Sequence, residues 1–244
     1  MIRSFNYNPP RVPLEILYID SSIVVLNKPA GLLTVPGKPK DHSDCLLSRL
    51  RKEVFGALLV HRLDLDTSGV IIFARTGSSQ VHLNKQFENQ KILKSYMARV
   101  NGHLLKDEDI INLPIIVDWP NRPIQKICFK TGKNASTHYK VIEREKGKNI
   151  SRVKLHPITG RSHQLRLHMK SIGHPIIGDP LYGSSRKIST RDDPNLKLAK
   201  EFKRQALHAK SLEFIHPFKQ ERVHFSVPLP SDMQTLLEAL RKSC

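Results

Sequence analysis

The sequence predicts an α+β fold with a mixed, largely antiparallel central sheet, flanked by helices and loops. Short β-branched and aromatic runs outnumber the segments with helical spacing. Consecutive runs are separated by turn residues, as in meanders of antiparallel strands. With 244 residues, the chain can bury a substantial core, as one large domain or as two subdomains.

The first half of the chain predicts an alternation of strands and helices. Residues 1–13 hold three prolines and no regular pattern, so we expect them to form an N-terminal extension. Two short apolar runs follow, separated by Asp20-Ser21-Ser22 as in a β-hairpin. In order, we expect strands at 16–19 and 23–26, a helix at 45–55, a strand at 69–75, a helix at 79–91 and a strand at 95–100.

The second half is richer in strands. Two apolar runs flank a loop with the only tryptophan, Trp119. Residues 183–204 are polar and basic and predict a loop or a marginal surface helix. A final helix is expected from Asp232, with Ser231 as its N-cap. The other expected elements are strands at 113–117, 126–129, 135–143, 150–155, 206–215 and 222–227, and a helix from about 161 to 172.

The charge of the chain favours a polyanionic partner. Lys and Arg number 40 against 22 acidic residues, a net charge of +18. The basic residues are spread along the whole chain, so we expect a folded surface rather than a tail to carry the charge. Nucleic acid is the first candidate partner and an anionic membrane surface the second.

The cysteines and the apolar runs argue against several other classes. Cys45, Cys128 and Cys244 match no metal or disulfide spacing, and the twelve histidines form no H-E-x-x-H pattern. We therefore expect no metal site. Without a signal-peptide pattern or an apolar run of membrane-spanning length, we expect a cytoplasmic protein with no membrane contact.

One dense group of charges directly precedes an apolar strand. The segment HRLDLDTSGVIIFAR (61–75) places four charged or titratable side chains before a run that is typical of a buried strand. They would lie at the rim of a sheet, where a rigid element can direct them toward a ligand. A plainer interpretation stays open, since Asp64 and Asp66 could simply close a turn by binding backbone amides.

A second dense polar segment, TGRSHQLRLH, covers 159–168. On a helix, His163, Arg166 and Leu167 would share one face. The plain interpretation is a solvated basic face. However, Gly160 lies where a strand meets the helix, and an Arg there can hold a carboxylate from another strand end in its ionised form.

These two segments resemble the signatures of the RluA family of pseudouridine synthases. HRLDLDTSG is similar to H-R-L-D-x-x-T-S-G, and GRSHQLRLHMKSIGHPIIGDPLYG is similar to the family's second hallmark. The resemblance covers nearly the whole chain, from NKPAGLLTVPG (27–37) to LHAKSLEFIHP (207–217). Two segments, YNPP near the N-terminus and residues 111–133, are most similar to those of the dual-specificity members of the family. These members act on a tRNA anticodon stem-loop and on a hairpin of 23S rRNA.

The resemblance implies the pseudouridine synthase fold, with two subdomains sharing the sheet, and RNA as the partner. It implies a catalytic domain at 14–230, followed by a C-terminal helix at 231–244. The implied targets are uridine 32 of tRNA and uridine 746 of 23S rRNA. Because the product is an isomer of the substrate, we expect an isomerase with no cofactor. A monomer is expected, because no apolar interface stripe is evident.

The resemblance also implies a role for each site residue. Asp64 is the catalytic carboxylate, Arg166 its ion-pair partner, and Tyr96 the ring that stacks on the flipped uracil. Arg62 would fill the space that the base leaves. His61, Arg161 and His163 complete the expected RNA-binding set. Asp66 falls at a variable position of the motif, so it keeps the turn interpretation.

Two other functions remain open at this point. A noncatalytic RNA-binding or ribosome-assembly factor on the same scaffold would explain the charge without using Asp64. A metal-dependent nuclease or glycosyl transferase would use Asp64 and Asp66 as a metal pair, although the chain offers no clear further carboxylate cluster.

Overall fold

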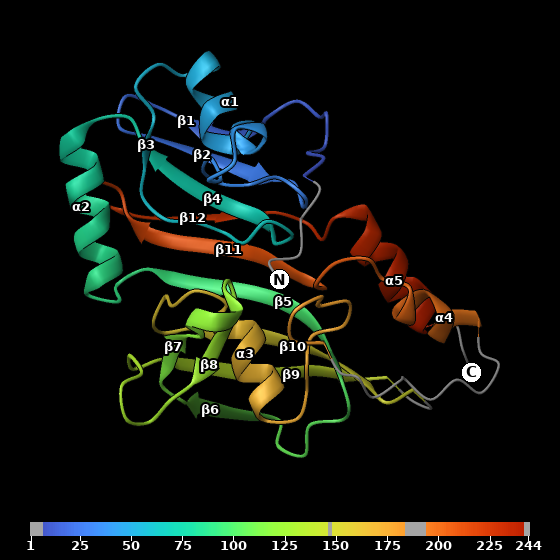
Figure 1. The fold of residues 1–244 in the computed structure, drawn as a ribbon. Helices are drawn as coiled ribbons and strands as arrows, with labels where there is room; N and C mark the ends of the chain where they lie inside the picture. The colour runs from blue at the N-terminus through green and yellow to red at the C-terminus, as the bar shows by residue number, and fades with distance from the viewer. Residues whose placement is uncertain (1–6, 146–147, 184–193, 242–244) are drawn as a thin grey trace. The chain divides into compact units, whose positions relative to one another are not determined.

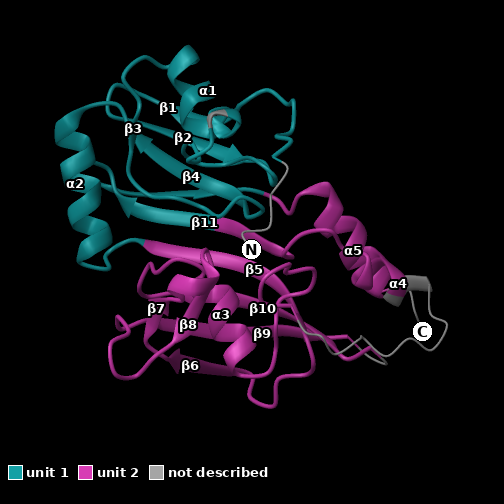
Figure 2. Cartoon of the chain, in the orientation of Figure 1, with its two compact units in different colours: residues 1–92, 211–227 teal, residues 93–210, 228–244 magenta. Residues whose placement is uncertain are grey.

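The computed structural model describes residues 7–145, 148–183 and 194–241. The chain divides into two compact units (Figure 2). Unit 1 contains residues 1–92 and 211–227, and unit 2 contains residues 93–210 and 228–244. Among the described residues, no helix is long and apolar enough to cross a membrane.

Unit 1 is built on a strongly apolar sheet. All seven residues of β4 (Ser68–Ala74) are buried, which explains why this segment reads as an apolar run. Strand β4 pairs antiparallel with β2 (Ile23–Lys28) and with the two-residue β3 (Leu58–Leu59). Unit 1 also contains β1 (Glu15–Ile19), β12 (Arg222–Ser226) and the α-helices α1 (Leu46–Glu53) and α2 (Gly77–Glu88) (Figure 1). Strand β1 pairs antiparallel with β2.

Strand β11 (Leu207–Ile215) crosses the boundary between the units, which falls after Lys210. Its last residues pair antiparallel with β12, from Ser211 opposite Ser226 to Ile215 opposite Arg222. Within unit 1, Leu212 and Phe214 pack in one buried cluster with apolar residues of β2 and β4.

In unit 2, strands β5, β10, β9 and β6 lie side by side in that order, each antiparallel to the next. Their bounds are Leu93–Asn101 for β5, Ile150–Pro157 for β10, Ser136–Arg144 for β9 and Glu108–Asn112 for β6. A separate hairpin pairs β7 (Ile115–Val117) with β8 (Gln125–Ile127). The helices are α3 (Gln164–Ser171), α4 (Pro194–Lys200) and α5 (Ser231–Arg241).

The predicted mixed, largely antiparallel sheet with flanking helices is confirmed. Two strands were not predicted. Strand β3 is only two residues long, and β6 has the sequence EDIIN, in which charged and amide residues hide the strand pattern. The division into 1–13, 14–230 and 231–244 stays a prediction.

Three predicted details differ in the structure or lie partly outside it. The helix expected from residue 161 begins at Gln164, because His163 takes a left-handed backbone conformation with φ of 54°. The last helix begins at Ser231 itself, so Ser231 is not the N-cap residue. In the segment 183–204, α4 forms at Pro194–Lys200, and residues 184–193 lie outside the described part.

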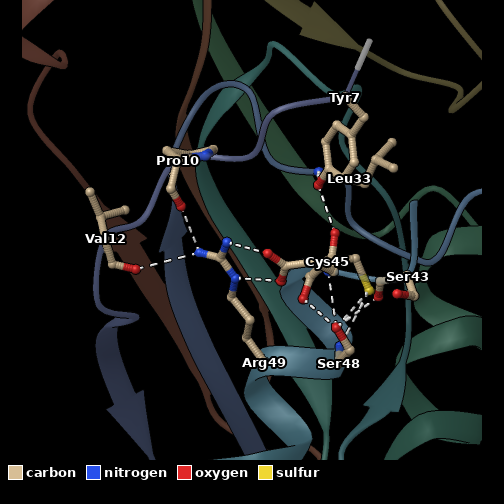
Figure 3. A network of polar contacts seen from close by, with 9 residues as sticks. Tyr7, Pro10, Val12, Leu33, Ser43, Cys45, Ser48 and Arg49 are labelled. Atoms are coloured by element: carbon tan, nitrogen blue, oxygen red, sulfur yellow. Dashed lines mark hydrogen bonds and ion pairs between the residues drawn. The ribbon is translucent and has the colours of Figure 1, made fainter. Parts of the chain in front are cut away.

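Residues 7–13, the described part of the N-terminal segment, are hydrogen-bonded to the rest of unit 1 (Figure 3). The Tyr7 hydroxyl donates to the carbonyl oxygen of Asp44 at 2.7 Å and accepts the Leu33 N–H at 3.1 Å. Arg49 of α1 donates to the Pro10 carbonyl oxygen at 2.8 Å. The same guanidinium holds the Asp44 carboxylate through two bonds of 2.7 Å. The segment therefore fixes the loop that leads into α1.

Candidate active site

The predicted catalytic segment is a loop that leads into β4 in unit 1. Asp64 is half-buried, Arg62 is exposed, and Leu63 between them is buried. The Thr67 N–H donates to the Asp64 carbonyl oxygen at 3.1 Å and closes a turn over 65–66. Asp64 therefore lies where a tight turn meets a completely buried strand.

A threonine clamps the residue before Asp64. The buried Thr34 hydroxyl donates to the Leu63 carbonyl oxygen at 2.8 Å and accepts the Leu63 N–H at 3.2 Å. The carbonyl oxygen of Thr34 in turn accepts the Leu47 N–H of α1 at 3.1 Å. Because one side chain satisfies both backbone groups of Leu63, this side of Asp64 has little freedom to move.

A buried lysine clamps the residue after Asp64. The Lys28 ammonium is completely buried and donates to the carbonyl oxygens of Pro29 at 2.9 Å, Leu32 at 2.6 Å and Leu65 at 2.9 Å. The Leu65 oxygen also accepts the Gly31 N–H at 3.0 Å. An ammonium has three N–H donors, and a buried charge is tolerated only when hydrogen-bonded. The three carbonyls supply these bonds and tie the turn to the end of β2.

The His61 ring faces the scaffold of unit 1. Its Nε2 accepts the Ile72 N–H of β4 at 3.2 Å, and its ring centroid lies 4.8 Å from that of Phe87 on α2. These contacts fix the start of the catalytic loop. Contact of His61 with RNA stays a prediction.

In unit 2, Arg166 is held by a carboxylate that sequence reasoning did not single out. Its Nε donates to Asp179 Oδ2 at 2.7 Å and its Nη2 to Oδ1 at 2.8 Å, and both side chains are buried. Asp179 Oδ1 also accepts the N–H groups of Leu181 and Tyr182, both at 2.9 Å. Asp179 lies in the GDPLYG part of the second signature, and its place in this motif could have identified it from the sequence.

The environment of Asp179 favours its ionised form. Burial alone would raise the pKa of its carboxyl group, but Arg166 and the two backbone amides lower the pKa below the ordinary value of 3.8. The solvated basic face is therefore the wrong description of Arg166. A guanidinium has five N–H groups, so one arginine can serve two carboxylates at once.

The rest of the second signature forms a network around the start of α3. His163 Nδ1 lies 2.9 Å from the Tyr182 hydroxyl. Gln164 Oε1 accepts the Thr159 hydroxyl at 2.7 Å and the Arg161 N–H at 3.0 Å. Nε of the exposed Arg161 donates to a backbone carbonyl at 3.1 Å. The strained His163 backbone is therefore supported on both sides.

Tyr96 lies on β5, half-buried against the main core of unit 2. Two residues before it, Lys94 donates to the Thr159 carbonyl oxygen at 3.3 Å. Burial lowers the pKa of Lys94 to about 8. Lys94 thus links β5 to the loop that carries Gly160 and Arg161.

The structure places the predicted residues in two groups. His61, Arg62 and Asp64 lie in unit 1, whereas the other four predicted residues lie in unit 2. The ion pair between Asp64 and Arg166 would join the units and stays a prediction. Among the described residues, no group of three or more His, Cys, Asp or Glu side chains could hold a metal ion. The metal-pair alternative therefore lacks a ligand cluster in this part of the chain.

Comparison with known proteins decides the class of enzyme. The family model for RNA pseudouridylate synthase matches residues 22–171. The chain belongs to this family. It is 47% identical over 224 residues to the dual-specificity RNA pseudouridine synthase RluA of Salmonella typhi, across 91% of this chain and 97% of that protein. The RluA of Escherichia coli K12 is 46% identical over the same shares of both chains.

Solved structures support the same conclusion. Human RNA pseudouridylate synthase domain containing 4 matches with a TM-score of 0.74 and 25% identity, over 93% of each chain. Domain containing 1, also human, matches with a TM-score of 0.68 and 26% identity. The chain is therefore an RNA pseudouridine synthase, an isomerase that acts on RNA, and the predicted α+β fold is that of its relatives.

The buried ion pair predicts a large loss of stability in Asp179→Asn. This substitution removes the buried carboxylate that Arg166 contacts within unit 2, so the free energy of unfolding should fall by about 3–5 kcal/mol at neutral pH. Urea unfolding followed by circular dichroism measures it. Asp44→Asn is the matched control, because its pair with Arg49 is partly exposed, and it should lose less than about 1 kcal/mol.

The same pair predicts a pH dependence. A carboxyl group with a lowered pKa contributes stability above its unfolded-state pKa, near 3.8, and loses it as the pH falls through the folded-state pKa. The difference between wild type and Asp179→Asn should therefore narrow in acid below that value. If the difference in the free energy of unfolding is small at neutral pH, or does not change in acid, Asp179 is not the ionised partner of Arg166.

The clamp on Leu63 predicts a catalytic defect in Thr34→Val. The substitution keeps the shape of the side chain but removes both bonds to the Leu63 backbone. If the clamp positions Asp64, the single-turnover rate constant should fall by roughly 10- to 100-fold, while the Kd for RNA stays within about twofold. Thr235→Val, in the exposed part of α5, should leave the rate constant unchanged. A wild-type rate in Thr34→Val would refute the positioning role.

Proposed function

We propose that this pseudouridine synthase modifies two RNAs, the anticodon stem-loop of tRNA at uridine 32 and a hairpin of 23S rRNA at uridine 746. The observation that carries this proposal is the similarity to relatives named as dual-specificity enzymes, which spans 91% of the chain. The net charge of +18 suits a protein that holds folded RNA by its phosphates.

In the proposed reaction, Asp64 carries out the central step. The bond between uracil N1 and ribose C1′ breaks, the base turns, and uracil C5 bonds to C1′. C5 then loses its proton and N1 gains one, so the atoms of substrate and product balance. The Asp64 carboxylate attacks the sugar or the ring, or takes a proton from the sugar. The clamps on Leu63 and Leu65 support this role, because a preorganised group need not be ordered during the reaction. Since the product is an isomer, we propose that no cofactor is consumed.

The other predicted residues would prepare the base and the carboxylate. Arg166 would pair with Asp64 and keep it ionised in a site that excludes water. Tyr96 would stack on the flipped uracil and assist in removing the C5 proton. The exposed Arg62 would take the place of the base in its stack, which lowers the cost of flipping. Arg161, His163 and His61 would hold the RNA around them.

The proposal also covers the domain organisation of the chain, its oligomeric state and its location in the cell. We assign residues 14–230 to the catalytic domain, with 1–13 as an extension and 231–244 as a C-terminal helix. We propose that the enzyme works as a monomer in the cytoplasm, where tRNA and ribosomal RNA are available.

A tritium-release assay tests the proposed chemistry. Transcripts labelled with tritium at uracil C5 should release it to water when the target uridine is in an anticodon stem-loop or in the 23S rRNA hairpin. Asp64→Asn should release none, whereas Asp66→Asn should keep most of the activity. Undiminished release by Asp64→Asn would place the chemistry elsewhere, and no release by the wild type from either RNA would refute the proposed substrates.

Arg62→Ala tests the base-replacement role. Without the guanidinium the flipped state loses its support, which is worth a few kcal/mol. The single-turnover rate constant should fall by roughly 100-fold, while the RNA still binds. Arg62→Lys should restore binding charge but little of the rate, because an ammonium cannot stack as a planar group. A normal rate in Arg62→Ala would remove this role.

A further inference from the structure

We propose that the β7–β8 hairpin is an RNA-contact element, and that its tip holds an unpaired base of the substrate against Trp119 and Arg122. The inference rests on the proposed function, and it adds a base-binding platform outside the predicted set of site residues.

The tip of this hairpin exposes a planar surface. Trp119 is 63% exposed, although an indole is usually buried for most of its area. The guanidinium carbon of Arg122 lies 4.6 Å from the centroid of the Trp119 ring, and Arg122 is itself exposed. An indole beside a guanidinium forms the kind of platform on which nucleic acid bases stack.

The charge of the hairpin and of the turn that follows β8 favours a polyanion. From 118 to 133 the sequence contains four cationic residues and one acidic residue, Asp118, which pairs with Lys126 at 3.1 Å. At the other end of the hairpin, the turn 128–133 is held against Pro114 and Ile115. Lys130 and Lys133 of this turn are exposed, and Phe129 is 77% exposed. Exposed aromatic rings interleaved with cations are typical of surfaces that bind unpaired RNA through stacking and phosphate contacts.

The inner face of the hairpin is anchored to the candidate active site of unit 2. The partly buried Ile124 and Ile127 pack in one cluster with Leu167 of α3 and Tyr182. The Gln125 N–H of β8 donates to the Tyr182 hydroxyl at 2.7 Å. Apolar residues therefore face inward, and the exposed aromatic rings are not needed to complete this core.

Tyr182 connects the hairpin with two predicted site residues, His163 directly before α3 and Arg166 within it. Its hydroxyl lies 2.9 Å from His163 Nδ1, and the guanidinium carbon of Arg166 lies 5.1 Å from its ring centroid. A base held at the tip would thus be kept at a fixed distance from Arg166 within one compact unit. The platform positions the RNA by a nucleotide that is not itself modified.

Trp119 is the only tryptophan of the chain, so its fluorescence reports on the tip alone. Full-length Asp64→Asn binds without turnover and is titrated with an anticodon stem-loop RNA, while anisotropy of the labelled RNA follows binding. Stacking should quench the emission by roughly half or more at saturation. A duplex of the same stem without its loop should quench it far less.

Variants give a second readout. Trp119→Ala should raise the Kd for the stem-loop by about tenfold, and Trp119→Phe should restore most of the affinity, because a smaller ring still stacks. Lys91→Ala removes an exposed cation of unit 1 and should change the Kd by less than about twofold at the same salt concentration. Circular dichroism checks that each variant is folded.

The outcomes separate this inference from the proposed function. If the wild type releases tritium from the RNA but emission stays constant at saturation, or if the loop-free duplex quenches equally, the platform is refuted and the enzyme function stands. If the RNA neither binds nor releases tritium, both are refuted. Loop-dependent quenching, together with the loss in Trp119→Ala and its recovery in Trp119→Phe, supports the platform.

Discussion

The proposed chemistry depends on the backbone around Asp64, which is fixed from within unit 1. Thr34 satisfies both backbone groups of Leu63, and Lys28 holds the carbonyl oxygen of Leu65. A completely buried ammonium would destabilise the fold if it had no acceptors, so its three carbonyl bonds tie the stability of unit 1 to the shape of the catalytic turn. The carboxylate is thereby positioned when the chain folds, before any RNA binds.

Unit 2 also holds a functional group in place, but there the group is a cation and a carboxylate holds it. The Arg166 guanidinium donates to the two oxygens of Asp179, and Oδ1 of Asp179 also accepts two backbone N–H groups. A buried pair of this kind adds little net stability compared with apolar packing, but it fixes the orientation of a charge. Each unit therefore supplies one oriented charged group for the proposed reaction. The hairpin beside α3 extends this rigid frame outward to a surface suited to unpaired RNA.

The elements with regular patterns could be predicted from the sequence, whereas the polar clamps could not. The apolar runs of β2 and β4 indicate buried strands directly, because burial of both faces leaves no polar alternation. Strand β6 was not predicted, because its sequence EDIIN belongs to a largely exposed strand and lacks an apolar run. Thr34 binds the backbone of Leu63, 29 residues away, and Lys28 binds that of Leu65, 37 residues away. Bonds over such separations leave no periodicity in the sequence. The left-handed backbone of His163 could not be predicted either, since it depends on contacts with residues far along the chain.

The most direct test of the role of Asp64 is a crystal structure of Asp64→Asn bound to the anticodon stem-loop. One uridine should leave its stack and contact the side chain of residue 64, while Thr34 and Lys28 still hold the adjacent backbone. A uridine that remains stacked, or that approaches the protein away from residue 64, would contradict this role. So would a catalytic turn that rearranges when RNA binds, because the geometry described above would then not be the reacting one.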